Sequence, residues 1–192
     1  MFKFINKKFS NIRLINVFKF ELQNYLIFIL KYIPGSLGVI SRALFYRFFI
    51  FKKSSFSVFI KENVTIEHGY NITFGKNVGI NCNTYINGIG ELLIGDNVLI
   101  SPNVVISTGF HPIDNVITIY GEPTLLEKVI IEDDVYIGAN SVIVPGVRIS
   151  KGSVIGANSL VNKSTKKFTI YGGVPIKQLR ERKQLDKKLV KK

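Results

Sequence analysis

The chain has 192 residues, a net charge of +13, one cysteine and two histidines. A length of this kind fits one domain with appendages. The single cysteine, Cys82, excludes an intrachain disulfide framework and fits a reducing, cytoplasmic compartment. Two histidines are too few for a three-histidine metal site, so no metal is expected.

The basic charge is concentrated at the two ends of the chain. Residues 1–53 carry ten Lys/Arg against one Glu, and residues 177–192 carry eight against two acidic residues. The remaining middle, residues 54–176, holds eight basic and ten acidic residues. This distribution argues against nucleic-acid binding and favours contact of the ends with an anionic membrane surface.

Residues 1–56 are predicted to form an N-terminal amphipathic helical region. Apolar residues recur at three and four from Ile12 to Ile33, Pro34-Gly35 ends that helix, and a second helical pattern runs from Leu37 to Phe48. No window reaches 18 apolar residues, so a spanning helix is not expected. No small-residue cleavage site follows a compact apolar run, so a cleavable signal peptide is not expected either. Two interpretations remain open: helices that cap the following domain, and helices that lie on a membrane, peripheral to its cytoplasmic face. Both can hold.

Aliphatic residues repeat every six positions over most of residues 57–172. The period is compatible with strands, and not with helices, because a strand repeats every second residue. The clearest run, from residue 131 to 161, has the members Ile131, Ile137, Ile143, Ile149, Ile155 and Val161. An earlier run is predicted at Ile60, Ile66, Ile72, Val78 and Thr84, followed by four extra residues near 88–91 and resumption at Ile94, Ile100 and Ile106. Hexads of this kind predict a parallel β-helix with an aliphatic stack inside its corners.

The repeat is interrupted and then ends in two irregular segments. Residues 107–128 fit no register and contain His111, so this excursion loop is predicted to concentrate function. After Val161, Gly172-Gly173-Val174-Pro175 predicts a turn, and residues 173–192 are predicted to form a short C-terminal helix with a basic tail.

In these residues the chain resembles the hexapeptide-repeat acetyltransferases of the galactoside and maltose O-acetyltransferase branch, including their polysaccharide-modifying relatives. The matching segments span roughly residues 60–182 and read GINCNTYINGIGELLIGDNVLISPNVVISTGFHP, EDDVYIGANSVIVPGVRISKGSVIGANSLVNK and GGVPIKQLRER. The resemblance implies a left-handed parallel β-helix, a homotrimer with active sites between neighbouring subunits, acetyl-CoA as acyl donor and no required metal.

The resemblance also implies roles for individual residues. His111 is expected to be the general base that takes the proton of the attacking hydroxyl. The backbone N–H of Ala139 is expected to stabilise the oxyanion, and Asn81 to contact the acceptor sugar. The residues expected to bind the cofactor are Ala139, Ala157, Lys163, Lys177 and Arg180. His68 lies outside these motifs and is predicted to be a surface turn residue.

One departure from the family bears on the acceptor. Where sugar-specific relatives place a carboxylate, Gly88 and Ile89 stand here, with Glu91 two residues further. The expected activity is therefore acetyl transfer to a sugar hydroxyl of a surface polysaccharide or lipid-linked glycan, not to the simple disaccharide of those relatives. The alternatives are an N-acyltransferase acting on an amino-nucleotide sugar, a xenobiotic (antibiotic) acetyltransferase, and a solenoid that binds a surface or partner without catalysis.

Overall fold

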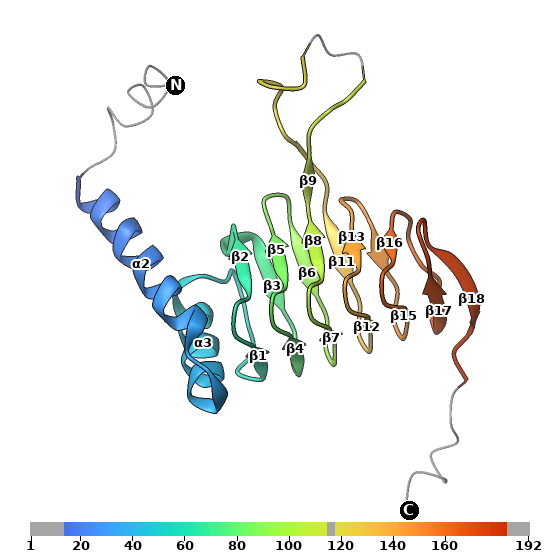
Figure 1. The fold of residues 1–192 in the computed structure, drawn as a ribbon, viewed down its shortest axis with the longest axis horizontal. Helices are drawn as coiled ribbons and strands as arrows, with labels where there is room; N and C mark the ends of the chain where they lie inside the picture. The colour runs from blue at the N-terminus through green and yellow to red at the C-terminus, as the bar shows by residue number, and fades with distance from the viewer. Residues whose placement is uncertain (1–13, 115–117, 184–192) are drawn as a thin grey trace, which may run out of the picture.

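A computed structural model describes residues 14–114 and 118–183 of the chain. It is a parallel β-helix with two helices at its N-terminal end (Figure 1). The helices are α2 (Leu14–Tyr32) and α3 (Gly35–Phe49), and a 3₁₀ turn, η1, covers Gly69–Asn71. Each coil of the β-helix passes in turn through three parallel sheets, here named sheets I, II and III, and the parallel β-helix predicted from the hexads is confirmed.

The strands are short, and each contributes one or two inward side chains. Sheet I contains β1 (Val58–Ile60), β4 (Val78–Ile80), β7 (Leu99–Ile100), β12 (Tyr136–Ile137), β15 (Val154–Ile155) and β17 (Thr169–Gly172), with β18 (Lys177–Glu181) added antiparallel. Sheet II contains β2 (Thr65–Glu67), β5 (Tyr85–Asn87), β8 (Val105–Ser107), β13 (Val142–Ile143) and β16 (Leu160–Val161). Sheet III contains β3 (Ile72–Phe74), β6 (Leu92–Ile94), β11 (Val129–Ile131) and β14 (Arg148–Ile149).

Stacked aliphatic side chains form the core along the whole solenoid. In sheet I, Ile80 pairs with Ile100, Ile100 with Ile137, and Ile137 with Ile155, and all four are buried. Removing such side chains from water is the main favourable contribution to folding. The tight corners use Asn in the left-handed conformation, which a short polar side chain tolerates. At the corner between sheets I and II the residues with positive φ are Asn63, Asn83, Asn103, Asn140 and Asn158.

The register of the first two coils differs from the prediction. Ile60 pairs with Ile80 and Ile80 with Ile100, so each of these coils has 20 residues, whereas the 18 residues between Ile137 and Ile155 make three hexads. The extra residues are two insertions of two, one at η1 and one near residues 88–91, and not a single insertion of four. The hexad pattern predicts the wrong register because Ile72 and Phe74 both face inward from β3.

The N-terminal helices are found where they were predicted, and α3 covers the first coil. Tyr46 of α3 is buried, its ring centroid lies 5.4 Å from that of Phe51, and the Phe51 ring lies 4.6 Å from that of Phe74. This aromatic stack closes the end of the hydrophobic column. Within the residues described, neither helix has the length and apolar character needed to cross a bilayer.

The predicted C-terminal helix is wrong for the residues that the structure describes. Residues 177–181 form β18, which pairs antiparallel with β17; the rest of the predicted helix, residues 184–192, lies outside the described residues. β17 is the last parallel strand of sheet I, and the antiparallel β18 satisfies its outer row of backbone groups. The Leu179 side chain lies against Gly172 of β17, since a Cβ added to Gly172 would lie 3.2 Å from Leu179 Cδ1.

The excursion loop leaves and rejoins the solenoid at one corner. It departs after β8, and β9 (Gly109–Phe110) pairs antiparallel with β10 (Leu125–Leu126) to form its stem. The chain then re-enters at β11, which pairs with both β6 and β14, so the coils stack without a gap. In Figure 1 this loop projects away from the solenoid on the side of sheet II.

Candidate functional site

Small residues line the corner between sheets I and II in the later coils. Because Ile137 pairs with Ile155, Gly138-Ala139 stacks directly on Gly156-Ala157. The coils approach closely there, since a Cβ added to Gly138 would lie 2.5 Å from the backbone N of Ala157. The corner is therefore a flat wall of main chain, with backbone groups accessible to a ligand.

The backbone N–H of Ala139 is available on this wall. The preceding N–H, of Gly138, donates to the Ile155 carbonyl at 2.8 Å, and the Ala139 carbonyl accepts from the Asn158 N–H at 2.8 Å. The Ala139 N–H itself donates to no residue within 14–114 or 118–183. Ala139 is half-buried, so this donor could stabilise a developing negative charge on a ligand oxygen.

We expect Gly138→Ala to destabilise the solenoid more than Gly156→Ala. The added methyl in the first variant meets main chain at 2.5 Å, which cannot yield without separating two coils, whereas the nearest atom in the second is 3.3 Å away. Overpacking of this kind costs about 1–3 kcal/mol. Urea unfolding of both variants measures the difference. Equal midpoints would contradict the close stacking at Gly138.

Asn81 lies on the same corner, two coils earlier. It follows Ile80, whose partner is Ile100, and its side-chain Nδ2 donates to the Ile100 carbonyl at 3.3 Å. In the part of the chain that the structure describes, Asn81 Oδ1 accepts no hydrogen bond. Asn81 is half-buried and can therefore offer an amide to a hydroxyl-bearing ligand.

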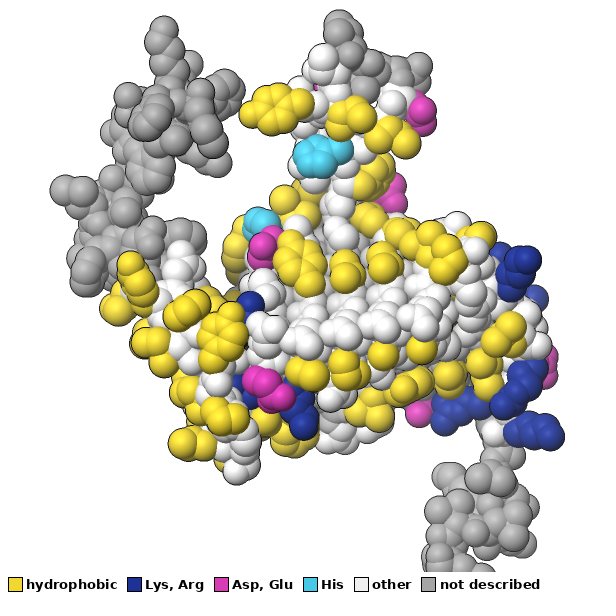
Figure 2. Space-filling view, viewed as in Figure 1, with side chains coloured by type: hydrophobic (Ala, Val, Ile, Leu, Met, Phe, Trp, Pro, Cys, Tyr) yellow, Lys and Arg dark blue, Asp and Glu magenta, His cyan; other side chains and the backbone are white. Residues whose placement is uncertain are grey.

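The predicted cofactor-binding cations do not all lie on this corner. Lys177 pairs with Gly172 at the end of β17, which adjoins β15, so it is close to exposed Ala157. Arg180 pairs with Ile170 further along the same strands, and Lys163 follows β16, at the opposite end of the strands of sheet II. All three cations are exposed, and Figure 2 shows Lys and Arg side chains gathered at this end of the solenoid. Such cations suit phosphate groups.

His111 is also separated from Ala139 within one chain. It follows β9 in the excursion loop, is exposed, and makes no hydrogen bond to a described residue. The loop leaves from the far end of the sheet II strands, whereas Ala139 immediately precedes them. A single chain therefore does not bring the predicted base and the predicted oxyanion donor together.

The corner between sheets II and III carries His68 and Glu91, and both are occupied by local contacts. His68 has φ 54° and its Nδ1 lies 3.1 Å from Asn87 Oδ1, as suits a turn residue. Glu91 lies 2.9 Å from Lys128 Nζ and 3.3 Å from Lys52 Nζ, and hydrogen bonds from these lysines lower the pKa of its carboxyl. Glu91 is thus committed to an ion-pair cluster and is a poor substitute for the missing family carboxylate.

Neither histidine belongs to a group of possible metal ligands in the described ranges. No three His, Cys, Asp or Glu side chains there lie close enough together to hold a metal ion.

Comparison with known proteins identifies the repeat. Residues 128–163 match a family model described as a hexapeptide repeat of succinyl-transferase. The galactoside O-acetyltransferase of Escherichia coli (strain K12) is 37% identical over 131 residues, which cover 68% of this chain and 64% of that protein. The chain thus spans a little under two thirds of that relative.

Two solved structures extend the likeness to the whole fold. A galactoside acetyltransferase in complex with coenzyme A superimposes with a TM-score of 0.76 at 31% identity, covering 90% of this chain and 85% of that one. A maltose O-acetyltransferase from Clostridium difficile 630 superimposes with a TM-score of 0.77 at 28% identity, covering 90% of both chains. The chain therefore belongs to the hexapeptide-repeat acetyltransferase family and is similar, within it, to the galactoside and maltose O-acetyltransferases.

Proposed function

We propose that this protein is an acetyl-CoA-dependent O-acetyltransferase that acts on a sugar hydroxyl of a surface polysaccharide or lipid-linked glycan. The observation that carries the proposal is the free Ala139 N–H on a wall of glycine and alanine. A thioester lying along that wall would place its carbonyl oxygen within reach of this donor. Ala157 leaves room for the pantetheine chain, and Lys177 stands where the phosphates would follow.

The reaction needs a base, an acyl donor and an oxyanion donor. His111 accepts the proton of the sugar hydroxyl as its oxygen attacks the thioester carbon, because a neutral imidazole can take up a proton near pH 7. The Ala139 N–H stabilises the negative charge on the carbonyl oxygen. The carbon–sulfur bond then breaks, the sugar ester forms, and the coenzyme A thiolate takes the proton back from the imidazolium.

The separation of His111 from Ala139 in one chain favours a homotrimer with sites between neighbouring copies. The outer face of sheet I offers an apolar surface for such contacts: Phe59 and Leu99 are each 54% exposed and Tyr136 is 43% exposed. Contiguous exposed apolar side chains are typical of association surfaces. In that arrangement the excursion loop of one copy would supply the base to the wall of the next.

The proposed acceptor class is inferred from the corner between sheets II and III. Gly88 and Ile89 carry no carboxylate, and Glu91 forms ion pairs with Lys52 and Lys128. Without a free carboxylate at that corner, the simple disaccharide acceptor of sugar-specific relatives loses a hydrogen-bond partner. Asn81 remains as an uncharged partner for hydroxyls on a larger glycan. An N-acyltransferase on an amino-nucleotide sugar is the second candidate, because the same base and wall would serve an amine.

Acetyl-CoA is expected to raise the melting temperature of the full chain. At a concentration of about a hundred times Kd, binding to the folded state adds about 2.7 kcal/mol of stability, which corresponds to several degrees for a chain of this size. Differential scanning fluorimetry with acetyl-CoA, and with acetate as control, measures the shift. An unchanged melting temperature would favour a non-catalytic solenoid. Release of coenzyme A thiol with galactoside, maltose, polysaccharide or amino-sugar acceptors then separates O- from N-transfer.

A further inference from the structure

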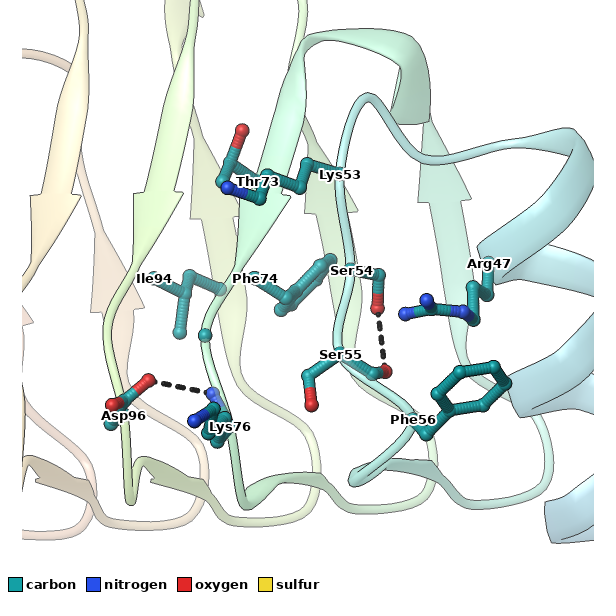
Figure 3. A pocket seen from close by; sticks show the side chains of 11 residues that line it. Arg47, Lys53, Ser54, Ser55, Phe56, Thr73, Phe74, Lys76, Ile94 and Asp96 are labelled. Atoms are coloured by element: carbon teal, nitrogen blue, oxygen red, sulfur yellow. Dashed lines mark hydrogen bonds between the residues drawn. The ribbon is translucent and has the colours of Figure 1, made fainter.

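A cavity separate from the wall of Ala139 lies between the C-terminal end of α3 and the first coils (Figure 3). Its volume is about 490 Å³, and Arg47, Lys53, Ser54, Ser55, Phe56 and Lys76 are among its lining residues. Three cationic side chains and three hydroxyl side chains, the third being that of Thr73, thus line one hollow. Asp96 is the one carboxylate in the lining.

Two nitrogens of the Arg47 guanidinium are buried and have no hydrogen-bond acceptor in the part of the chain that the structure describes. Its Nε and Nη1 are shielded from solvent and donate no hydrogen bond to a described residue, while its Cζ lies 3.7 Å from the centroid of the Phe56 ring. Figure 3 shows the guanidinium directed from α3 toward the Ser54–Ser55 segment, beside Phe56. Nη2 is not among the shielded nitrogens and donates no hydrogen bond to a described residue, so the guanidinium can offer this donor and its charge to an anion in the cavity.

The other polar groups of the cavity also leave room for an anion. No described carboxylate lies within 4 Å of Lys53 Nζ or Lys76 Nζ, whereas the neighbouring Lys52 is paired with Glu91 at 3.3 Å. Asp96 is already engaged, because its Oδ1 accepts the backbone N–H of Lys76 at 2.7 Å. A planar guanidinium with ammonium groups and hydroxyls nearby matches the oxygens of a phosphate.

The rim of the cavity is apolar and exposed. Phe56 is 68% exposed and also lines an adjoining groove with Ile40 and Leu44. The ring of Phe48, 64% exposed, lies 6.2 Å from that of Phe56. Figure 2 shows hydrophobic side chains gathered over α2 and α3. An anion site set in an apolar surface fits an amphiphile, with a charged head and a hydrocarbon tail, better than a free ion.

We propose that the Arg47 cavity binds the phosphate of an anionic membrane phospholipid, with Phe48 and Phe56 inserted at the level of the acyl chains. Arg47 donates to the phosphate oxygens, and Lys53 and Lys76 supply the remaining positive charge. The helical end of the solenoid then rests on the bilayer while the later coils stay in water. This proposal does not depend on the acetyltransferase activity.

Sedimentation of the full chain with vesicles tests the lipid site. We expect strong binding to phosphatidylcholine vesicles containing phosphatidic acid, and weak binding to phosphatidylcholine alone. Arg47→Gln should lower the affinity about tenfold, because hydrogen bonds to charged groups are lost, and Lys53→Gln should lower it about fivefold. Lys52→Gln removes the same charge at the neighbouring position. Because Lys52 is paired with Glu91, the effect of this variant should be small.

Inorganic phosphate and a rim variant separate the possible sources of the phosphate. Isothermal titration with inorganic phosphate should show weak saturable binding to the wild type and to Phe48→Ser, and none to Arg47→Gln. Phe48→Ser should lose vesicle binding. Phosphate binding without vesicle binding by the wild type would overturn the lipid assignment in favour of a soluble phosphorylated ligand. Equal losses of vesicle affinity in Lys52→Gln and Lys53→Gln would mean that the binding is diffuse electrostatic attraction, and would overturn the site. Arg47→Lys, which keeps the charge without the planar fork, provides a second test if Arg47→Gln does not fold.

Discussion

Replacing His111 with alanine is expected to lower kcat/KM for acetyl transfer by about 10²- to 10⁴-fold, the usual contribution of a general base. The stability of the fold should not change, because His111 is exposed in the excursion loop and makes no hydrogen bond to a described residue. Turnover is measured by release of coenzyme A thiol with whichever acceptor the wild type uses. The melting temperature and its increase with acetyl-CoA are measured on the same samples.

His68→Ala is the matched control for the His111 variant. His68 is the other histidine of the chain and lies at a corner, where its Nδ1 is 3.1 Å from Asn87 Oδ1. This variant should keep turnover within a few-fold of the wild type. Added imidazole should restore part of the activity of His111→Ala, because the free base can occupy the vacated space. Full activity in His111→Ala would remove His111 from the role of base and leave the acetyl-CoA wall unaffected.

Much of the solenoid could be predicted because its signal is local. From Ile131 to Val161 each inward residue recurs after six positions, and the strands that carry them pair in the same order. The interruption at residues 107–128 could be predicted for the same reason, because the hexad register is lost there. Local periodicity gives the wrong register at β3, because Ile72 and Phe74 both face inward there. The hexad pattern therefore predicts one insertion of four residues where the structure has two insertions of two.

The features that the sequence predicts wrongly, or does not indicate, depend on contacts between residues that are distant in sequence. Residues 177–181 have a weak helical stripe, but the unpaired edge of β17 decides their conformation. Arg42 and Arg47 appear in the sequence only as interruptions of an apolar helix. Their partners are backbone carbonyls and an aromatic ring on other elements, and no spacing in the chain indicates them. The position of Ala139 was predictable by motif, whereas its distance from His111 in one chain was not.

Arg42 joins three segments at the N-terminal end of the solenoid. It is 1% exposed; its Nη1 donates to the carbonyls of Leu30 and Ile33 at 2.7 Å, and its Nε donates to that of Ile60 at 2.9 Å. The first two carbonyls belong to the C-terminal end of α2 and the turn that follows, where carbonyls lack helical partners. Burial lowers the pKa of the Arg42 guanidinium from its ordinary value, and the Glu62 carboxylate partly opposes this shift. Arginine remains protonated at neutral pH despite such a shift.

Replacing Arg42 with alanine is expected to lower the free energy of unfolding by about 3–5 kcal/mol, because three carbonyls lose a charged donor and a buried volume is left empty. Arg148→Ala is the matched control: Arg148 forms an exposed ion pair with Glu132, and its loss should cost less than about 1 kcal/mol. Urea unfolding gives both values, and hydrogen exchange should show faster opening of α2 in Arg42→Ala, because two of the three hydrogen bonds hold the end of that helix. Arg42→Lys should fall between the two, since an ammonium keeps the charge but cannot donate from the positions of both Nε and Nη1. A loss below about 1 kcal/mol in Arg42→Ala would mean that the aromatic stack of Tyr46, Phe51 and Phe74 closes the solenoid without this clamp.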